Sequence, residues 1–169
     1  MEATKYASIP TLYNGVKFRS RLEARWACLF DMLSWQWVYE PFDAGGYIPD
    51  FLIRFSNPLV VEVKPIFEEN DFRWGTTAKR MRDSGIQGEI LVVGARVMSS
   101  VKDDYCSIGF GLSGMGKMHF CMTQGCGDFT PFDRCLCDQS HRDLSQCAYN
   151  HLDSKWKMAG NVVQWKGNQ

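Results

Sequence analysis

Three charged residues in two neighbouring segments carry the clearest chemical signal in this sequence. Asp50 follows Pro49 in one alternating apolar segment, and Glu62 and Lys64 lie in the next. If the two segments form an antiparallel hairpin turning about Asn57, Asp50 lies directly across from Lys64 and diagonal to Glu62, on one face of the sheet. Diagonal Cβ atoms lie roughly 7–8 Å apart, so the two carboxylates can share a Mg²⁺ with oxygen ligands at about 2.0–2.1 Å. The pattern predicts a divalent-metal centre with a lysine beside it.

This prediction depends on the register of the hairpin. A turn centred half a residue away would send Asp50 to the opposite face from Glu62. The alternate positions of the second segment are all Leu or Val, so they are expected to form the core face and to leave the charged face exposed. The simplest alternative is that Glu62 and Lys64 are ordinary solvent-facing residues of an amphipathic strand. The Pro49-Asp50 pair on the neighbouring strand favours the metal centre.

Apolar periodicity and turn signals predict the elements that must position these residues. Ser20-Arg-Leu-Glu23 is a capping-box pattern, and apolar residues follow it at helical spacing. The expected order is a helix over 20–33, strands over 35–39, 47–55 and 59–64, a helix from Asn70 or Asp71 to Ser84, and a buried strand over 89–93. The sequence therefore predicts an α/β fold of the order αβββαβ.

The remainder of the chain differs in character. Gly109–Gly116 is rich in glycine and is expected to be a loop, a Cys-rich stretch follows over 119–137, and apolar residues four apart predict a helix over about 141–159. We therefore expect a core over residues 1–105 and an extension over 106–169 whose C-terminal helix packs on that core.

Four sequence blocks resemble the PD-(D/E)XK nuclease superfamily, and more narrowly small nuclease-like proteins of bacteriophages and prophages. The blocks are Arg19-Ser-Arg-Leu-Glu23-Ala-Arg-Trp, Tyr39-Glu-Pro41, Tyr47-Ile-Pro-Asp50-Phe and Val61-Glu62-Val-Lys64-Pro, and the resemblance covers roughly residues 13–95. It implies a restriction-endonuclease-like αβββαβ core and cleavage of nucleic-acid phosphodiesters with Mg²⁺ or Mn²⁺.

The resemblance also implies roles for individual residues. Asp50 and Glu62 would be metal ligands, joined by the carbonyl of Val63. Lys64 would orient or help deprotonate the attacking water and stabilise charge on the phosphate. Glu23 matches an acidic residue that adds a ligand or supports one, although a glutamate at the third position of a helix also serves as part of its cap.

The charges are unevenly distributed although the formal net charge is zero. One basic group comprises Lys17, Arg19, Arg21 and Arg25, and another comprises Lys79, Arg80 and Arg82. Solvated helix faces are the common explanation for such groups. Two basic groups flanking a carboxylate centre would also suit a phosphate backbone, and the candidates for nucleic-acid contacts are Arg19, Arg21 and Lys79.

Cysteine clusters in the C-terminal part: five of the seven lie between Cys121 and Cys147. Cys121 and Cys126 form one close pair and Cys135 and Cys137 another, as in a zinc ribbon, although neither pair has the usual two-residue spacing. The phage proteins that the core resembles often carry such a ribbon. Other ligand sets would use His119, His141, Cys147 or His151, and the remaining alternative is small buried thiols in a reducing cell.

Together these features predict a Mg²⁺- or Mn²⁺-dependent nuclease acting on DNA, with one structural Zn²⁺ in the extension. RNA as the substrate, or a non-catalytic module that binds nucleic acid or protein, are the alternatives. A homodimer would explain paired cuts. No apolar run reaches membrane-spanning length and the first ten residues lack the layout of a signal peptide, so we expect a cytoplasmic protein, in a bacterial host if it is phage encoded.

Overall fold

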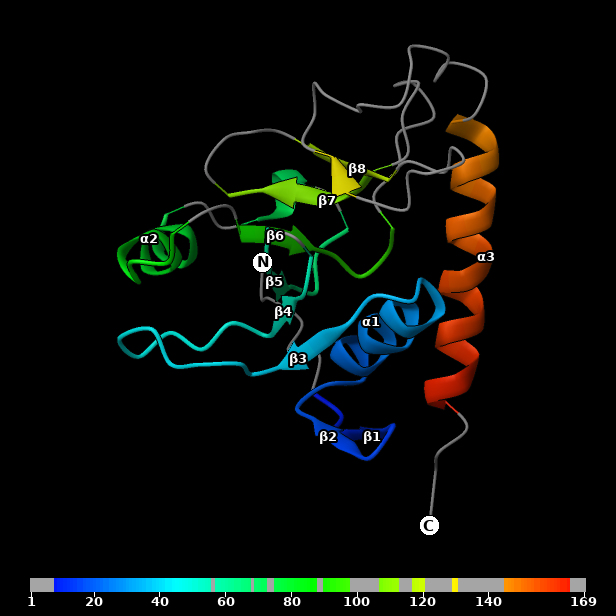
Figure 1. Ribbon diagram of the computed structural model, residues 1–169, viewed down its shortest axis with the longest axis horizontal. Coiled ribbons are helices and arrows are strands. Elements are labelled where there is room, and N and C mark those ends of the chain that lie inside the picture. The colour runs from blue at the N-terminus through cyan, green and yellow to red at the C-terminus, as the bar shows by residue number, and fades with distance from the viewer. Residues whose placement is uncertain are drawn as a thin grey trace, which may run out of the picture.

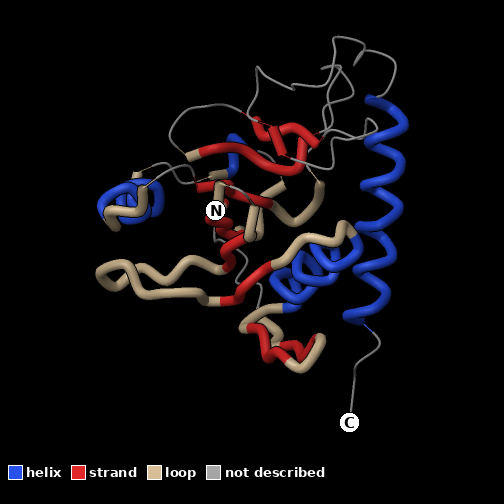
Figure 2. Tube along the Cα trace, viewed as in Figure 1, coloured by secondary structure: helices blue, strands red, loops and turns tan. Residues whose placement is uncertain are grey.

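The computed structural model describes most of the N-terminal two thirds of the chain and the C-terminal helix. The described residues are 8–55, 57–67, 69–72, 75–87, 90–97, 107–112, 117–120, 129–130 and 145–164. Within these ranges the chain is a mixed α/β structure that contains a two-stranded hairpin and a seven-stranded sheet (Figures 1 and 2). The α/β class predicted from the sequence is confirmed.

The described elements follow the predicted order from the first helix to the sixth strand. They are β1 (Thr11–Tyr13), β2 (Val16–Phe18), α1 (Arg21–Met32), β3 (Trp37–Tyr39), β4 (Phe51–Ile53), β5 (Leu59–Val63), a 3-10 turn η1 (Glu69–Asp71), α2 (Thr76–Asp83), β6 (Ile90–Val93), β7 (Ser107–Gly111), β8 (Lys117–Phe120), β9 (Phe129–Thr130) and α3 (Ser145–Gln164). The second helix begins later than expected, because residues 69–71 form a separate 3-10 turn.

The first helix forms where its cap predicts. The Ser20 hydroxyl accepts a hydrogen bond from the Glu23 N–H at 3.1 Å and so satisfies one of the free donors of the first turn. Trp26, Leu29 and Phe30 then recur on one face and are fully buried. The helix ends at Met32, and Ser34 after it adopts a φ of 60°.

The large sheet has the order β3-β4-β5-β6-β7-β8-β9. Only the β5–β6 pair is parallel in the described sheet, and the chain makes that crossover through α2. A parallel pair needs such a crossover, because the chain must return to the same end of the sheet. The long connection between β3 and β4 projects on the same side of the molecule as α2 (Figure 1).

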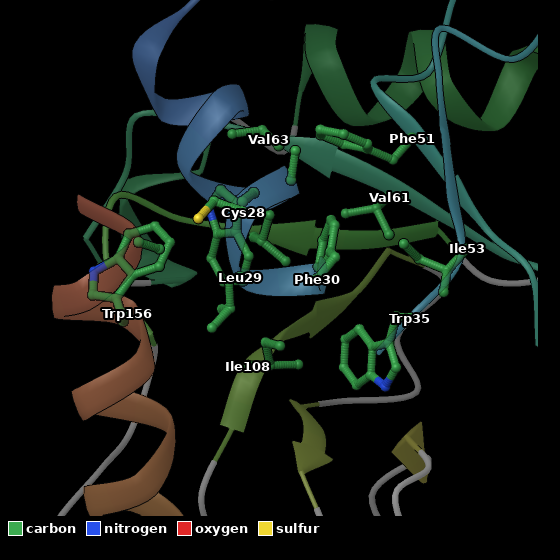
Figure 3. Packing of buried hydrophobic residues seen from close by; sticks show 14 of the residues in the cluster. Cys28, Leu29, Phe30, Trp35, Phe51, Ile53, Val61, Val63, Ile108 and Trp156 are labelled. Carbon is green, nitrogen blue, oxygen red and sulfur yellow. The ribbon is translucent and has the colours of Figure 1, made fainter. Parts of the chain in front are cut away.

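Both faces of the sheet are covered. On one face, α1 packs against the sheet and α3 packs against α1, and Figure 3 shows Leu29 and Phe30 of α1 between Trp156 of α3 and Val61 of β5. On the other face, Val60 and Val92 pack beneath Ala78 and Met81 of α2. All five residues of β5 are therefore buried, and the expectation that its charged face is solvent-exposed is wrong.

The C-terminal helix packs on the first one. The Trp156 ring lies 4.7 Å from the Trp26 ring, and the Arg25 guanidinium lies 3.8 Å above the Trp156 ring. The helix continues to Gln164, beyond the predicted end, and Val163 extends its buried stripe. Among the described residues, no helix is both long enough and apolar enough to cross a bilayer.

The glycine-rich segment that was expected to be a loop, Gly109–Gly116, begins inside strand β7, which runs to Gly111; residues 113–116 lie outside the described residues. A Cβ placed on Gly109 would lie 2.3 Å from the Val92 carbonyl oxygen and 2.9 Å from Leu91 Cδ1. Glycine is therefore needed here for the close approach of β7 to β6, whereas glycine content alone was interpreted as a loop signal. Periodicity cannot distinguish these two uses of glycine.

Replacing Gly109 with alanine is expected to destabilise the fold by about 1–3 kcal/mol or more, because the added methyl meets backbone that cannot move aside. Urea unfolding followed by circular dichroism measures the effect. Gly75→Ala is the matched control, since nothing lies within 4 Å of a Cβ at Gly75. An unchanged unfolding midpoint for Gly109→Ala would contradict the observed β6–β7 packing.

Candidate active site

The β4–β5 hairpin places the two predicted acids opposite each other. Phe51 pairs with Val61, and continuing this register by one position sets Asp50 across from Glu62, with Lys64 diagonal to Asp50. The predicted pairing of Asp50 with Lys64 is wrong, because the turn is centred one residue earlier than expected. That error shifts the pairing by two residues and preserves side-chain parity, so the acids still share one face.

Asp50 is 4% exposed, and both of its carboxylate oxygens are occupied by donors. The Val63 N–H donates to Oδ2 at 2.7 Å, and Arg19 Nη2 donates to Oδ1 at 2.8 Å. Burial, followed by the negative charge of Glu62, raises the pKa of Asp50 to about 7. Burial and the charge of Glu62 therefore both disfavour the ionised form of Asp50.

Glu62 is 5% exposed and is also hydrogen-bonded at both oxygens. The Tyr47 hydroxyl donates to Oε2 at 2.7 Å, and the Lys64 ammonium contacts Oε1. Burial and the Glu62 charge raise the pKa of Tyr47, which keeps its hydroxyl protonated as a donor. The Lys64 side chain is 30% exposed and so joins the buried pair to solvent.

Tyr47 is a site residue that sequence reasoning did not single out. It lies in the β3–β4 connection, because β4 begins at Phe51 and the strand predicted from residue 47 is shorter than expected. Its one signal in the sequence was its place in the Tyr47-Ile-Pro-Asp50-Phe block.

Glu23 contributes to both its cap and the site. Its Oε1 accepts from the Ser20 hydroxyl at 2.8 Å, and its Oε2 accepts from the Tyr39 hydroxyl at 2.6 Å. The Tyr39 oxygen in turn accepts from the Arg19 N–H at 3.1 Å. After burial and Glu62, the charge of Glu23 also raises the pKa of Asp50. The charge of Glu23 therefore acts on the acid pair, and the Tyr39 hydroxyl links Glu23 to the backbone N–H of Arg19.

The donor set fits a hard divalent cation. Among the described residues no three Asp, Glu, His or Cys side chains converge on one point. Mg²⁺ is nevertheless commonly bound by one or two carboxylates and several waters, and two facing acids supply that set. A cation would also offset the repulsion that raises the pKa of Asp50. Val63, the expected carbonyl ligand, contacts Asp50 through its N–H.

The three predicted nucleic-acid contacts have different surroundings. Arg19 pairs with Asp50 and, through Nε, with Glu40 at 2.9 Å. Arg21 is the exposed first residue of α1. Lys79 is exposed on α2 and pairs with Asp83.

A hollow of about 340 Å³ lies between α2 and the β3–β4 connection. Lys79, Arg80 and Tyr47 are among its lining residues, and Arg80 Nη2 donates to the Gly46 carbonyl at 2.7 Å. Tyr47 also donates to Glu62, so its side chain lies between the hollow and the acid pair, and neither acid lines the hollow.

The predicted zinc ligands Cys121, Cys126, Cys135 and Cys137 lie outside the described residues, as does the alternative ligand His141. His119, Cys147 and His151 lie in described elements, but their side chains do not belong to the described part of the structure.

Comparison of the chain with protein-family models, with curated proteins and with solved structures gives no match in any of the three. The resemblance to nucleases therefore rests on the four sequence blocks.

Proposed function

We propose that this protein is a metal-dependent nuclease that hydrolyses DNA phosphodiester bonds, of the PD-(D/E)XK type that its sequence resembles. One observation carries the proposal: Asp50 and Glu62 face each other in a buried position, and Lys64 contacts Glu62 from the solvent side. A fold gains no stability from burying two like charges together, so the arrangement is best explained by a ligand that needs both.

The chain holds each acid in a fixed orientation. The Val63 N–H is part of strand β5 and fixes one oxygen of Asp50. The Tyr47 hydroxyl fixes one oxygen of Glu62. Each acid keeps a second oxygen whose present partner is a long, partly exposed side chain, Arg19 or Lys64. A rigid, preoriented pair of this kind costs little reorganisation when it binds a cation.

Lys64 would act on the attacking water and on the phosphate. A bound Mg²⁺ or Mn²⁺ would polarise the scissile phosphate and lower the pKa of the attacking water. Lys64 lies between the Glu62 carboxylate and solvent, so its ammonium can align that water and offset charge that builds on the phosphate. Glu62 holds the ammonium at the edge of the buried pair.

The substrate is tested with purified protein and Mg²⁺, Mn²⁺ or EDTA against closed circular duplex, linear duplex and single-stranded DNA, and RNA. Metal-dependent DNA cutting is expected, and cutting of the closed circle identifies an endonuclease. If the protein binds DNA but cuts none of these under any divalent metal, the proposal fails and a non-catalytic binding module replaces it.

We propose that the substrate backbone passes over the hollow beside Tyr47, where Lys79 and Arg80 are both exposed lining residues. Arg80 is bonded to the Gly46 carbonyl, so Lys79 is the cation chosen for the test. In a cleavage-deficient Lys64→Ala background, Lys79→Ala is expected to lower the slope of log affinity against log salt by about 1, the effect of one lost phosphate contact. Arg82→Ala is the matched control, because Arg82 lies on the same helix but is not among the lining residues. Equal slopes for the two variants would exclude Lys79 as a backbone contact.

A further inference from the structure

Arg19 occupies the position that a cation needs. Of the two Asp50 oxygens, Oδ2 is bound by the backbone N–H of Val63, which is fixed in the sheet. The other, Oδ1, is bound by Arg19 Nη2, and the Arg19 side chain is 57% exposed. A cation that binds Asp50 together with Glu62 therefore competes with Arg19 at Oδ1, because the bond from the Val63 N–H to Oδ2 is fixed in β5 and the Arg19 side chain is not.

Arg19 is also held by a second acid that lies outside the buried pair. Its Nε donates to Glu40 Oε1 at 2.9 Å, and the Glu40 N–H donates to the Asp50 carbonyl at 3.0 Å. Glu40 adopts a φ of 45°, in the left-handed region that costs energy for a residue with a side chain. This backbone conformation places the Glu40 carboxylate next to Asp50, with Arg19 bridging the two.

The main chain of Arg19 is anchored separately from its side chain. The Arg19 N–H donates to the Tyr39 hydroxyl, which itself donates to Glu23. The guanidinium can therefore leave Asp50 while its backbone and its Glu40 contact stay in place. A guanidinium freed on one edge presents N–H donors that suit a phosphate.

We infer that Arg19 is a displaceable counter-ion: it neutralises Asp50 before the cation arrives, and once displaced it remains on Glu40 and binds a phosphate of the nucleic acid. This inference rests on the proposed function. Arg19 would then have opposite effects on the binding of the metal and of DNA. It competes with the metal for Asp50, and it contributes a contact to the DNA phosphate. Metal binding then favours DNA binding, and by linkage DNA binding favours the metal.

Titration calorimetry with Mn²⁺ alone tests the first half. Arg19→Ala is expected to bind Mn²⁺ about tenfold more tightly than wild type, the change that corresponds to losing one competing charge-assisted hydrogen bond. Lys17→Ala is the matched control, because it removes the same charge from an exposed position on β2 without touching Asp50. Its Mn²⁺ affinity should stay close to that of wild type.

DNA binding tests the second half. In the Lys64→Ala background and with saturating Mn²⁺, Arg19→Ala is expected to bind duplex DNA more weakly and with a salt slope smaller by about 1. Circular dichroism of each variant confirms folding. If Arg19 had only a structural role, Arg19→Ala would bind both Mn²⁺ and DNA more weakly. The inference requires that it bind Mn²⁺ more tightly and DNA more weakly.

Equal or weaker Mn²⁺ binding by Arg19→Ala overturns the inference and leaves the nuclease proposal standing. An equal gain in Lys17→Ala overturns it too, because the effect would then be general electrostatics. If wild-type protein and both variants bind no Mn²⁺, the metal centre itself is wrong and the inference falls with it.

Discussion

Asp50→Asn should abolish DNA cleavage and weaken Mn²⁺ binding by about 100-fold or more. The asparagine keeps the shape of the side chain and can still accept from the Val63 N–H. It removes the negative charge that faces Glu62, and with it one of the two carboxylates available to the cation. Loss of groups that merely support a metal ligand typically costs about 10–100-fold, so loss of a ligand should reach or exceed the upper end of that range.

The stability of the same variant separates loss of the metal from loss of the fold. Burial and the charge of Glu62 raise the pKa of Asp50 to about 7, so its ionised form is disfavoured in the folded protein without metal. The variant also loses the ion pair with Arg19, whose side chain is exposed, so the two effects oppose each other and the melting temperature of the metal-free protein should change little. Mn²⁺ should then raise the melting temperature of wild type but have little effect on Asp50→Asn. A variant that is unstable and also inactive would not support the assignment.

Lys64→Ala should reduce cleavage by about 10²–10³-fold, the usual cost of losing one preorganised donor to a transition state. The side chain is partly exposed, so its removal opens no core cavity and should change stability little. Its contact is with Glu62 and not with Asp50, so both carboxylates remain for the cation. Single-turnover rates with saturating Mn²⁺ measure the effect.

Mn²⁺ affinity distinguishes this variant from Asp50→Asn. Lys64→Ala should bind Mn²⁺ at least as well as wild type, because an ammonium next to Glu62 is lost while both acids stay. Cleavage at the wild-type rate would show that Lys64 has no part in the reaction, whatever the metal does.

Local signals in the sequence were sufficient for the element order from α1 to β6 and for the face that the acids share. The Ser20 cap and the apolar stripe behind it predicted α1 because capping and helical spacing act over a few residues. Alternation placed Asp50 and Glu62 on one face because strand parity survives a register error of two residues.

Features that depend on distant parts of the chain were not predicted. The acids are buried because α2 and the β3–β4 connection cover their face, and no property of β5 alone reveals that cover. Gly109 was interpreted as part of a loop, because the need for glycine at this position comes from the Val92 carbonyl, which lies on another strand. The pairing of Arg19 with Asp50 was not predicted because the two residues are far apart in the sequence.

The most direct test of the metal-dependent centre compares cleavage by wild type, Asp50→Asn and Lys64→Ala, purified identically and assayed side by side on one duplex with Mn²⁺ or EDTA. We expect cutting by wild type with Mn²⁺, none with EDTA, and a loss of about 100-fold or more in both variants, with Mn²⁺ still bound by Lys64→Ala. Cutting that persists in both folded variants, or wild-type protein that binds DNA and cuts nothing under any divalent metal, would contradict the assignment of Asp50, Glu62 and Lys64 as a nuclease active site.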